Sequence, residues 1–246
     1  MLTLRELDGN QFLASLEACA AVYAAAMNPP AEQLPGRHTI MERHAGYAAF
    51  RAIAAIMLPA DGEQDPGAAP ARAGPARAGG ARAGPARAGG ARAGGTGAGE
   101  ARAGGDGEAP RLVGFAYGFH GAGGQWWHDV VSRAAASALG ADAAEDWFGD
   151  SLEIAEVHVL PGHQGRGTGL AMMLGLTAGR PERAAVLSTM DANTRARRLY
   201  HGLGFTDLLT GFVFPGTDLP YAIMGAPLPL RGASPRSARP ARPSRW

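Results

Sequence analysis

The chain has 246 residues, of which 46% are hydrophobic and 18% are charged. That length is enough for one large domain or two small domains with a hydrophobic core. The 23 basic and 22 acidic residues nearly cancel, which argues against a nucleic-acid binder of the uniformly basic kind. Residues 231–246 carry five Arg and no acid, so the remainder is mildly acidic and would suit a cationic amine.

The cysteine content and the apolar pattern exclude further classes. Cys19 is the only cysteine, so no disulfide can form within one chain, no cysteine cluster can hold a metal, and we expect no metal site. The longest uninterrupted apolar stretch, 18–27, has ten residues, whereas a membrane-spanning helix needs about 20. The N-terminus has no basic region followed by an apolar run, so no signal peptide is predicted. These features predict a cytoplasmic protein without membrane contact.

A low-complexity segment interrupts the first half of the chain. Residues 66–105 are almost entirely Ala, Arg, Gly and Pro, and the sequence ARAGPARAGG occurs twice in succession. Apart from Arg and Glu100, no side chain larger than Thr is present to build a core, so this segment cannot recover the entropy lost on ordering. The tail 231–246 has the same character. We therefore predict a single domain over 1–230, interrupted by a disordered insert at 61–110 in a hairpin loop, and a disordered Arg-rich tail.

The N-terminal elements are predicted from periodicity and from helix-ending residues. A weak strand at 3–7 precedes a helix at 8–27, which the segment Asn28-Pro29-Pro30 ends. A second helix is predicted at 37–47 and a strand at 50–58. The buried face of the first helix is expected to carry five residues at helical spacing, Phe12, Leu16, Cys19, Tyr23 and Met27.

The C-terminal elements complete a mixed α/β layer fold. One helix is predicted between 120 and 151. The helix at 168–179 is expected to bury Leu170, Met173, Leu174 and Leu176. A further helix is predicted at 193–202, and strands are predicted at 111–120, 151–160, 184–190, 208–214 and 221–226.

The most informative segment joins the end of a strand to the start of a helix. Gly165, Gly167 and Gly169 lie at this junction. Glycines allow a tight turn in which several amide N–H groups converge, and a helix N-terminus adds partial positive charge. The segment therefore predicts a pyrophosphate site. It lacks both the Gly-Lys-Ser/Thr ending of a P-loop and the GxGxxG spacing of a dinucleotide fold.

Two sequence blocks resemble a known family. The spacing Gln164-x-x-Gly167-x-Gly169 resembles the acetyl-CoA signature of the GNAT superfamily of N-acetyltransferases, Gln/Arg-x-x-Gly-x-Gly/Ala. A second block begins 29 residues later and matches the family at five of five positions, Asn193, Ala196, Tyr200, Gly204 and Phe205. The resemblance is sharp over 151–205. It implies a GNAT-like mixed, mostly antiparallel central sheet flanked by helices, with a splay between the fourth and fifth strands.

The resemblance also implies acetyl-CoA as cosubstrate and assigns roles to residues. The backbone of Val157 and Val159 would pair with the pantetheine arm, as in strand addition. Asn193 would hydrogen-bond the pantetheine, and Tyr200 stands where the family places the general acid that protonates the leaving thiolate. The amides of 164–169 would hold the pyrophosphate. The implied cofactor-binding residues are Val157, His158, Val159, Gln164, Gly165, Arg166, Gly167, Thr168, Gly169, Asn193 and Ala196.

A base is needed because an ammonium must lose a proton before its nitrogen can attack. Glu153 stands at the offset before Gln164 at which histone-acetyltransferase members carry their catalytic Glu. Glu156 lies three residues further on and has the opposite parity on a regular strand, but a bulge in the fourth strand would remove that distinction. We predict both as candidate bases and prefer Glu156 because it adjoins the splay. For His158, a third candidate, a packed side chain is the simpler interpretation.

Some of these residues also have ordinary structural interpretations. Tyr200 can be a core aromatic, and Asn193 can be the N-cap of its helix. In Gln125-Trp126-Trp127-His128-Asp129, adjacent Trp side chains would point to opposite sides of an extended chain. Only one is therefore expected in an acceptor pocket, where an aromatic face suits a cationic amine. The alternative is that both anchor the loop to the sheet.

These observations predict an N-acetyltransferase, a monomer or homodimer, that transfers an acetyl group from acetyl-CoA to a primary amine by direct attack. The acceptor would be a small molecule or a peptide. The alternative is an acyl-CoA-binding sensor or accessory domain without turnover. A regulator that docks on nucleic acid through its Arg-rich segments is a third hypothesis, which we disfavour because the insert lacks aromatic residues for stacking.

Overall fold

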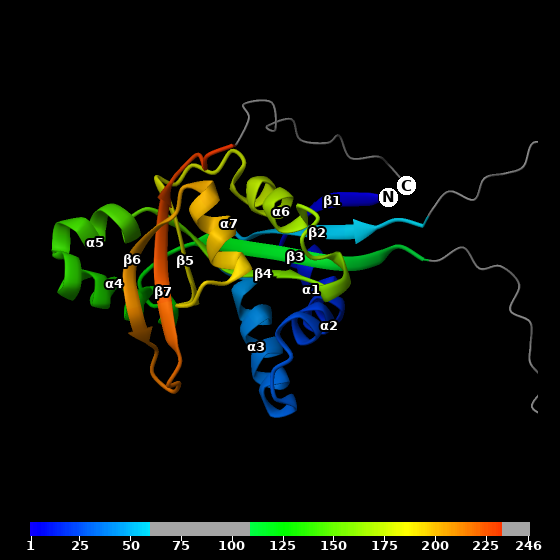
Figure 1. Cartoon of the computed structure of the whole chain (residues 1–246), viewed down its shortest axis with the longest axis horizontal. Coiled ribbons are helices and arrows are strands. Elements are labelled where there is room, and N and C mark those ends of the chain that lie inside the picture. The colour runs from blue at the N-terminus through cyan, green and yellow to red at the C-terminus, as the bar shows by residue number, and fades with distance from the viewer. Residues whose placement is uncertain (60–108, 233–246) are drawn as a thin grey trace, which may run out of the picture. The chain divides into compact units, whose positions relative to one another are not determined.

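The computed structural model describes residues 1–59 and 109–232 (Figure 1). These residues form a sheet whose strand order is β1-β2-β3-β4-β5-β7-β6. No helix among them is long and apolar enough to cross a membrane. The strands are β1 (Leu2–Leu7), β2 (Arg51–Met57), β3 (Arg111–His120), β4 (Ser151–Val159), β5 (Ala184–Met190), β6 (Thr206–Val213) and β7 (Pro220–Pro227). The helices are α1 (Gly9–Ala14), α2 (Leu16–Met27), α3 (Leu34–His44), α4 (Trp126–Leu139), α5 (Ala141–Phe148), α6 (Thr168–Thr177) and α7 (Arg195–Leu203), with short 3-10 helices η1 (Ala31–Gln33) and η2 (Pro161–His163).

The sheet is antiparallel except where β4 and β5 pair in parallel. That pairing joins Ser151–Glu153 to Ala184–Val186, yet β4 continues to Val159 and β5 continues to Met190. The two strands therefore part after Glu153. In Figure 1, β5, β7 and β6 run steeply across the direction of β1 to β4. The mostly antiparallel sheet with a splay between its fourth and fifth strands, which the resemblance implied, is confirmed.

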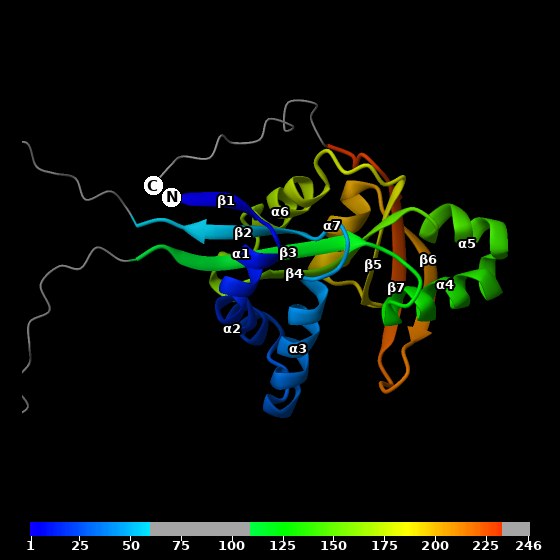
Figure 2. The same ribbon diagram turned by 180° about the vertical axis from the view of Figure 1, so that it is seen from behind.

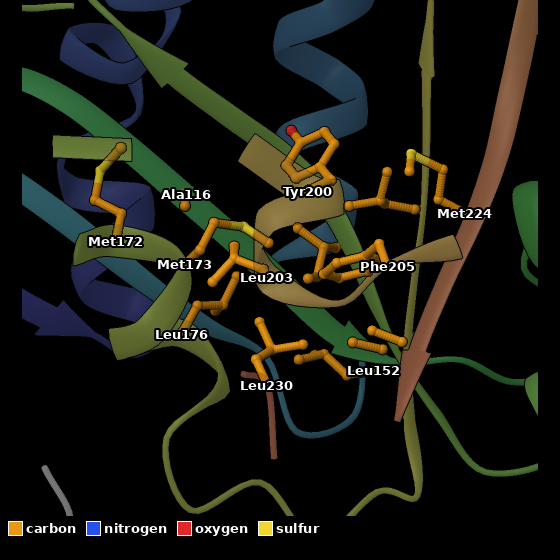
Figure 3. Packing of buried hydrophobic residues seen from close by; sticks show 14 of the residues in the cluster. Ala116, Leu152, Met172, Met173, Leu176, Tyr200, Leu203, Phe205, Met224 and Leu230 are labelled. Carbon is orange, nitrogen blue, oxygen red and sulfur yellow. The ribbon is translucent and has the colours of Figure 1, made fainter. Parts of the chain in front are cut away.

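Helices cover both faces of the sheet, and each group of helices lies over its own hydrophobic cluster (Figure 2). Met172, Leu176 and Leu203 of α6 and α7 pack on one face (Figure 3). Helices α1, α2 and α3 cover the opposite face over β2 and β3, while α4 and α5 cover β5 and β7. Cys19 is fully buried in the cluster of α1, α2 and α3, and this burial raises the pKa of its thiol to about 12. It is the core residue that the sequence predicted.

A β-bulge in β4 decides which of its side chains share a face. In the pairing with β3, Tyr117 lies opposite Glu156 and Gly118 lies opposite Ile154, so Ala155 is an extra residue. Ile154 packs on the side of α6 and α7, whereas Ala155 packs against the cluster of α1, α2 and α3. The bulge reverses the parity of the residues that follow it. Glu153 and Glu156 therefore face the same side of the sheet.

A long connection joins β2 to β3, and the two strands pair with each other. The two strands are antiparallel, with Ala52 opposite Tyr117. Residues 60–108 of this connection lie outside the described residues, and so do residues 233–246. The disorder predicted for 61–110 and for 231–246 thus falls almost entirely outside the described part of the chain.

Two predicted helices are each divided. The helix predicted at 8–27 comprises α1 and α2, which meet at Ser15, where the side-chain hydroxyl donates to the carbonyl of Gln11. Such a bond back to the preceding turn competes with regular helix formation. Met27 was wrongly placed on the buried face, since it is 54% exposed. The single helix predicted before β4 is α4 and α5, separated by Gly140, which has a φ of +96° that favours glycine.

The buried face of α6 also differs from the prediction. Leu170, in the first turn beside the exposed glycine-rich segment, is 41% exposed, so its assignment to the core was wrong. Met172, which the prediction omitted, is fully buried together with Met173 and Leu176. The buried stripe is therefore rotated toward Met172.

Two leucines of α6 give a matched test of this packing. Leu176→Ala should lower the free energy of unfolding by about 2–5 kcal/mol, because it leaves a cavity in a fully buried cluster. Leu170→Ala should lower it by less than about 1 kcal/mol, because much of that side chain is already in water. Urea unfolding of the full chain, followed by circular dichroism, measures both. Equal losses in the two variants would contradict the observed orientation of α6.

Candidate active site

A cavity of about 450 Å³ lies on the sheet face that carries Glu153 and Glu156. Both carboxylates line it, together with Ser188 of β5 and the connection between β6 and β7. We call it the central cavity. Its basic residues come from α3 and are Arg37, Arg43 and His44, and its aromatic residues are Tyr47, Phe119, Trp126, Trp127, Phe214 and Tyr221.

Glu156 is a buried carboxylate that is held as an anion. Nη1 of Arg37 donates to its Oε1 at 2.8 Å, and its Oε2 contacts Nε2 of His158. Burial by itself would raise the pKa of Glu156, but the bond to His158 and the charge of Arg37 hold the pKa below its ordinary value. The Arg37 guanidinium also lies 5.0 Å from the ring centroid of Tyr23. Glu156 thus ties α2 and α3 to β4.

Glu153 has a different environment. Its side chain is 4% exposed, and its Oε1 lies 2.7 Å from Nδ1 of His128 in α4. Burial raises the pKa of Glu153, although the bond to His128 opposes this effect. A carboxylate whose pKa is raised toward neutrality accepts a proton more readily than one whose pKa is lowered. This environment favours Glu153 as the base and argues against our preference for Glu156.

Gly121, which follows β3, lies directly against the pair formed by Glu153 and His128. A Cβ atom on Gly121 would lie 2.6 Å from Oε1 of Glu153 and 3.0 Å from Nδ1 of His128. A larger residue at this position would therefore displace one of the two side chains. The close approach of Gly121 holds the pair in place.

The peptide groups of β4 beyond the bulge point in alternating directions. The Leu160 amide donates to the Val113 carbonyl of β3. By alternation, the peptide groups of Val157 and Val159 point away from β3, into the splay, as a strand-addition site requires. One of these groups already has a partner, because Nε2 of Gln164 donates to the Val159 carbonyl at 3.0 Å.

His158 is directed elsewhere. Its backbone lies on the β3 side, where its carbonyl would be 2.9 Å from a Cβ on Gly114. Its side chain contacts Glu156 and lies edge-on to the ring of Tyr23, with 5.1 Å between the centroids. The packed side chain is therefore the better interpretation, and neither part of His158 faces the splay.

The glycine-rich turn leaves several amide groups without backbone partners. Gly165 and Gly167 have φ angles of +75° and +82°, which favour glycine, and α6 begins at Thr168. Among the described residues, the amides of 165–167 donate to no backbone carbonyl. Those of Thr168 and Gly169 lie in the first turn of α6, where helix amides lack partners within the helix. The Gln164 amide, by contrast, donates to the Pro161 carbonyl at 3.3 Å.

The second sequence block lies beside this turn. A Cβ on Gly165 would be 3.1 Å from Nη1 of Arg195, the first residue of α7. The N-cap of α7 is Thr194, whose side chain accepts from the Arg197 amide, so the N-cap prediction for Asn193 was wrong. Asn193 is exposed, and its Oδ1 accepts from Arg198. Ala196 is exposed in the first turn of α7.

Tyr200 lies at the margin of the cluster formed by α6 and α7. It is 7% exposed, and its ring centroid lies 5.8 Å from that of Phe205. Its hydroxyl turns away from Leu203 and Phe205 (Figure 3). Burial raises the pKa of Tyr200 to about 12, and the nearby charge of Glu156 acts in the same direction. The hydroxyl is therefore protonated at neutral pH, as a proton donor must be.

The paired tryptophans do not follow the prediction for an extended chain. Trp126 and Trp127 begin α4, and both line the central cavity, so the expectation that only one would face a pocket was wrong. Nε1 of Trp127 donates to Ser188 at 3.2 Å, which fixes α4 to β5. Trp126 is 57% exposed and lies 5.8 Å from the ring centroid of Phe214.

Sequence reasoning missed the contribution of α3. Nδ1 of His44 lies 3.0 Å from the hydroxyl of Tyr117, and burial lowers the pKa of His44 to about 4. Arg37 and His44 lie in no recognisable motif, and only the folding of α3 against β4 reveals their position. Within the part of the chain that the structure describes, no group of three His, Cys, Asp or Glu side chains is placed to hold a metal ion.

Comparison with known proteins agrees with this geometry. Residues 104–205 match the acetyltransferase (GNAT) family, over both sequence blocks. The match is to a family-wide pattern and so does not depend on any one relative. Residues 104–205 are thus similar to the GNAT acetyltransferases.

Individual relatives add detail. The chain is 43% identical over 123 residues to the GCN5-like protein acetyltransferase Rv2170 of Mycobacterium tuberculosis. The match covers 48% of this chain and 60% of that relative, so it spans less than two thirds of the relative's length. Crystal structures of Arabidopsis thaliana NAA60, with a bisubstrate analogue and with acetyl-CoA, share the fold with a TM-score of 0.50 and 14% identity. Each comparison covers 93% of this chain and 99% of the NAA60 chain.

The two cavity carboxylates should affect stability in opposite directions. The raised pKa of Glu153 means that its ionisation costs stability as the pH rises above the ordinary value of 4.5, so Glu153→Gln should stabilise the protein at neutral pH. The lowered pKa of Glu156 means that its contribution is present above 4.5 and is lost as the pH falls. Glu156→Gln should therefore cost about 1–3 kcal/mol at neutral pH. Urea unfolding between about pH 4 and pH 7 tests both variants. If both substitutions changed the free energy of unfolding at neutral pH in the same direction, the environments described here would be contradicted.

Proposed function

We propose that this protein is an acetyl-CoA-dependent N-acetyltransferase that acetylates a primary amine by direct nucleophilic attack. One observation supports this most strongly. Glu153, a buried carboxylate with a raised pKa, lines the central cavity at the residue where β4 leaves β5. A base at this position stands between a pocket for the amine and an open strand edge for the acyl carrier.

The splay would suit the pantetheine arm of acetyl-CoA, and the glycine-rich turn would suit its pyrophosphate. The pantetheine arm, an amide-containing chain, would pair with the outward peptide groups of Val157 and with the Val159 amide. The pyrophosphate would lie on the amides of 165–169 at the N-terminus of α6, where φ angles that favour glycine let the backbone converge. Arg195, beside Gly165, and Arg166 in the turn would add positive charge. Gln164 would act by shaping the turn, since its amide and side chain are already bonded.

The reaction would then proceed in one chemical step between the two ligands. Glu153 takes a proton from the ammonium, and the amine nitrogen attacks the thioester carbonyl. A backbone N–H on the splayed strand meets the developing oxyanion. As the C–S bond breaks, the Tyr200 hydroxyl gives its proton to the thiolate and regains one from the nitrogen, and Glu153 then releases its proton to solvent. Glu156, which is bonded to Arg37 and His158, would hold α3 against β4.

The side chains that line the central cavity indicate the chemical class of the acceptor. Six aromatic side chains and the carboxylate of Glu153 suit a cationic primary amine, whether it belongs to a small molecule or to a peptide. The name of the M. tuberculosis relative, a protein acetyltransferase, supports the peptide acceptor. The alternative function, an acyl-CoA sensor without turnover, leaves the pairing of Glu153 with His128 without a role.

Calorimetric titration of the full chain should show micromolar binding of acetyl-CoA and no binding of ATP. Gly167→Val should abolish acetyl-CoA binding, because a branched side chain would fill the space over the turn. Gly179→Val is the matched control: Gly179 also has a positive φ, +64°, but lies beyond the opposite end of α6. Binding by the Gly167 variant equal to that of the control would refute the pyrophosphate site. Absence of binding by the unmodified chain would refute the proposed function.

Tyr200→Phe should lower kcat by about 100-fold, because the leaving thiolate loses its proton donor, while the Kd for acetyl-CoA changes little. Thiol release measures kcat, and calorimetry measures Kd. Tyr200→Ala serves as the comparison, because it removes the buried ring and should also destabilise the fold by about 3–5 kcal/mol. If Tyr200→Phe lost stability and affinity together with turnover, Tyr200 would be structural only.

A further inference from the structure

The pair formed by Glu153 and His128 connects two separate hollows in the protein surface. A second hollow of about 350 Å³ lies between α4 and α5, and His128 lines it together with Asp129, Arg133 and Glu145. Glu153 lines the central cavity but not this hollow, and His128 lines the hollow but not the cavity. We call the second one the α4–α5 hollow. The bond of 2.7 Å between the two side chains thus links the central cavity to the α4–α5 hollow.

The two ring nitrogens of His128 have different surroundings. Its Nδ1 is engaged with Glu153. Because the partly exposed side chain of His128 lines the hollow, Nε2 is the ring nitrogen that is available to the water there. Phe148 of α5 lies edge-on to this ring, with 6.4 Å between the centroids, and Gly121 lies against Nδ1. The side chain is 13% exposed, so it is packed yet reaches water.

The charges around His128 favour its protonated form. The hydrogen bond to Glu153 raises its pKa most, and the charges of Asp129 on α4 and Glu145 on α5 add to the effect, while burial opposes it. Arg133 also lines the hollow, and His120 on β3 acts on Glu153 from the other side. The bond to Glu153 and the two neighbouring carboxylates therefore favour the imidazolium form of His128.

We propose that His128 is a positioning residue that holds Glu153 through Oε1 and releases its Nε2 proton into the α4–α5 hollow when Glu153 takes the proton of the acceptor. The inference rests on the proposed function. It places the proton that is released during the step in the α4–α5 hollow, while the acceptor's own proton stays on Glu153 until the product has left.

The step balances in protons and in charge. An ammonium, the Glu153 carboxylate and the His128 imidazolium become an amine, a neutral carboxylic acid and a neutral imidazole, and one proton enters the water of the hollow. The pair carries no net charge before or after the step, so the buried site never holds an unpaired charge. After the product leaves, the acid loses its proton to water in the open cavity and the imidazole regains one from the hollow.

The other groups near the central cavity are less suited to this role. Glu156 is occupied by Arg37 and His158. His44 is engaged with Tyr117, and its pKa of about 4 keeps it neutral at neutral pH. Neither group touches Glu153, whereas His128 does.

The test compares the pH dependence of turnover in two variants. His128→Asn keeps a donor amide near the position of Nδ1 but cannot titrate. We expect kcat to fall by about tenfold and the acid limb of kcat/KM to move up by about one pH unit, because Glu153 loses a positive neighbour. The Kd for acetyl-CoA should stay within about twofold, since His128 lies outside the predicted cofactor site. Ser132→Ala, one turn along α4 in the same hollow, should keep the original profile.

A second measurement does not depend on turnover. NMR titration of the His128 ring should give a lower pKa in Glu153→Gln than in the unmodified chain, because the carboxylate partner is gone. An unchanged ring pKa, or a His128→Asn profile identical to that of the unmodified enzyme, would overturn the inference. A chain that shows the coupled titration but no thiol release with any amine would instead overturn the proposed function.

Discussion

The separation of β4 from β5 after Glu153 is the constraint on which the rest of the site depends. Three residue pairs join these strands in parallel, and beyond them the two strands no longer pair with each other, although β3 and β7 still pair with their other edges. Unpaired strand edges are costly to bury, because each peptide group needs a hydrogen-bond partner. An extended ligand that carries amides can supply those partners. The same parting opens the sheet for the central cavity, so the carrier site and the acceptor site arise from one departure from regular pairing.

The bulge at Ala155 turns this opening into a chemical site. Without the extra residue, Glu156 would point into the cluster of α6 and α7, where a buried charge would have no partner. With it, two carboxylates share one face and meet different neighbours. Arg37 and His158 hold Glu156 as an anion, whereas the smaller support from His128 leaves Glu153 with a raised pKa. One carboxylate thus contributes to stability, and the other retains an affinity for protons at some cost in stability.

The sequence predicted the elements around the two blocks well because those elements are set by local rules. β3 and β5 have the bounds expected from their apolar runs, and the turn at Gly165 and Gly167 follows from residues that tolerate positive φ. The errors have local causes too: the hydroxyl of Ser15 divides a helix, and Thr194 rather than Asn193 caps α7. The choice between Glu153 and Glu156 could not be made from the sequence. It depends on a bulge and on residues of α3 and α4 that come from distant parts of the chain.

The two strands on either side of the long connection are held by their pairing with each other where it joins them, far from the site. β2 ends at Met57, and β3 begins at Arg111. The central cavity meets β3 at Phe119, near the opposite end of the strand, which at about 3.3 Å per residue is more than 25 Å away. Closing a longer loop costs free energy only as the logarithm of its length. The pairing of β2 with β3 can therefore hold both strands in register, whatever the length of the connection between them.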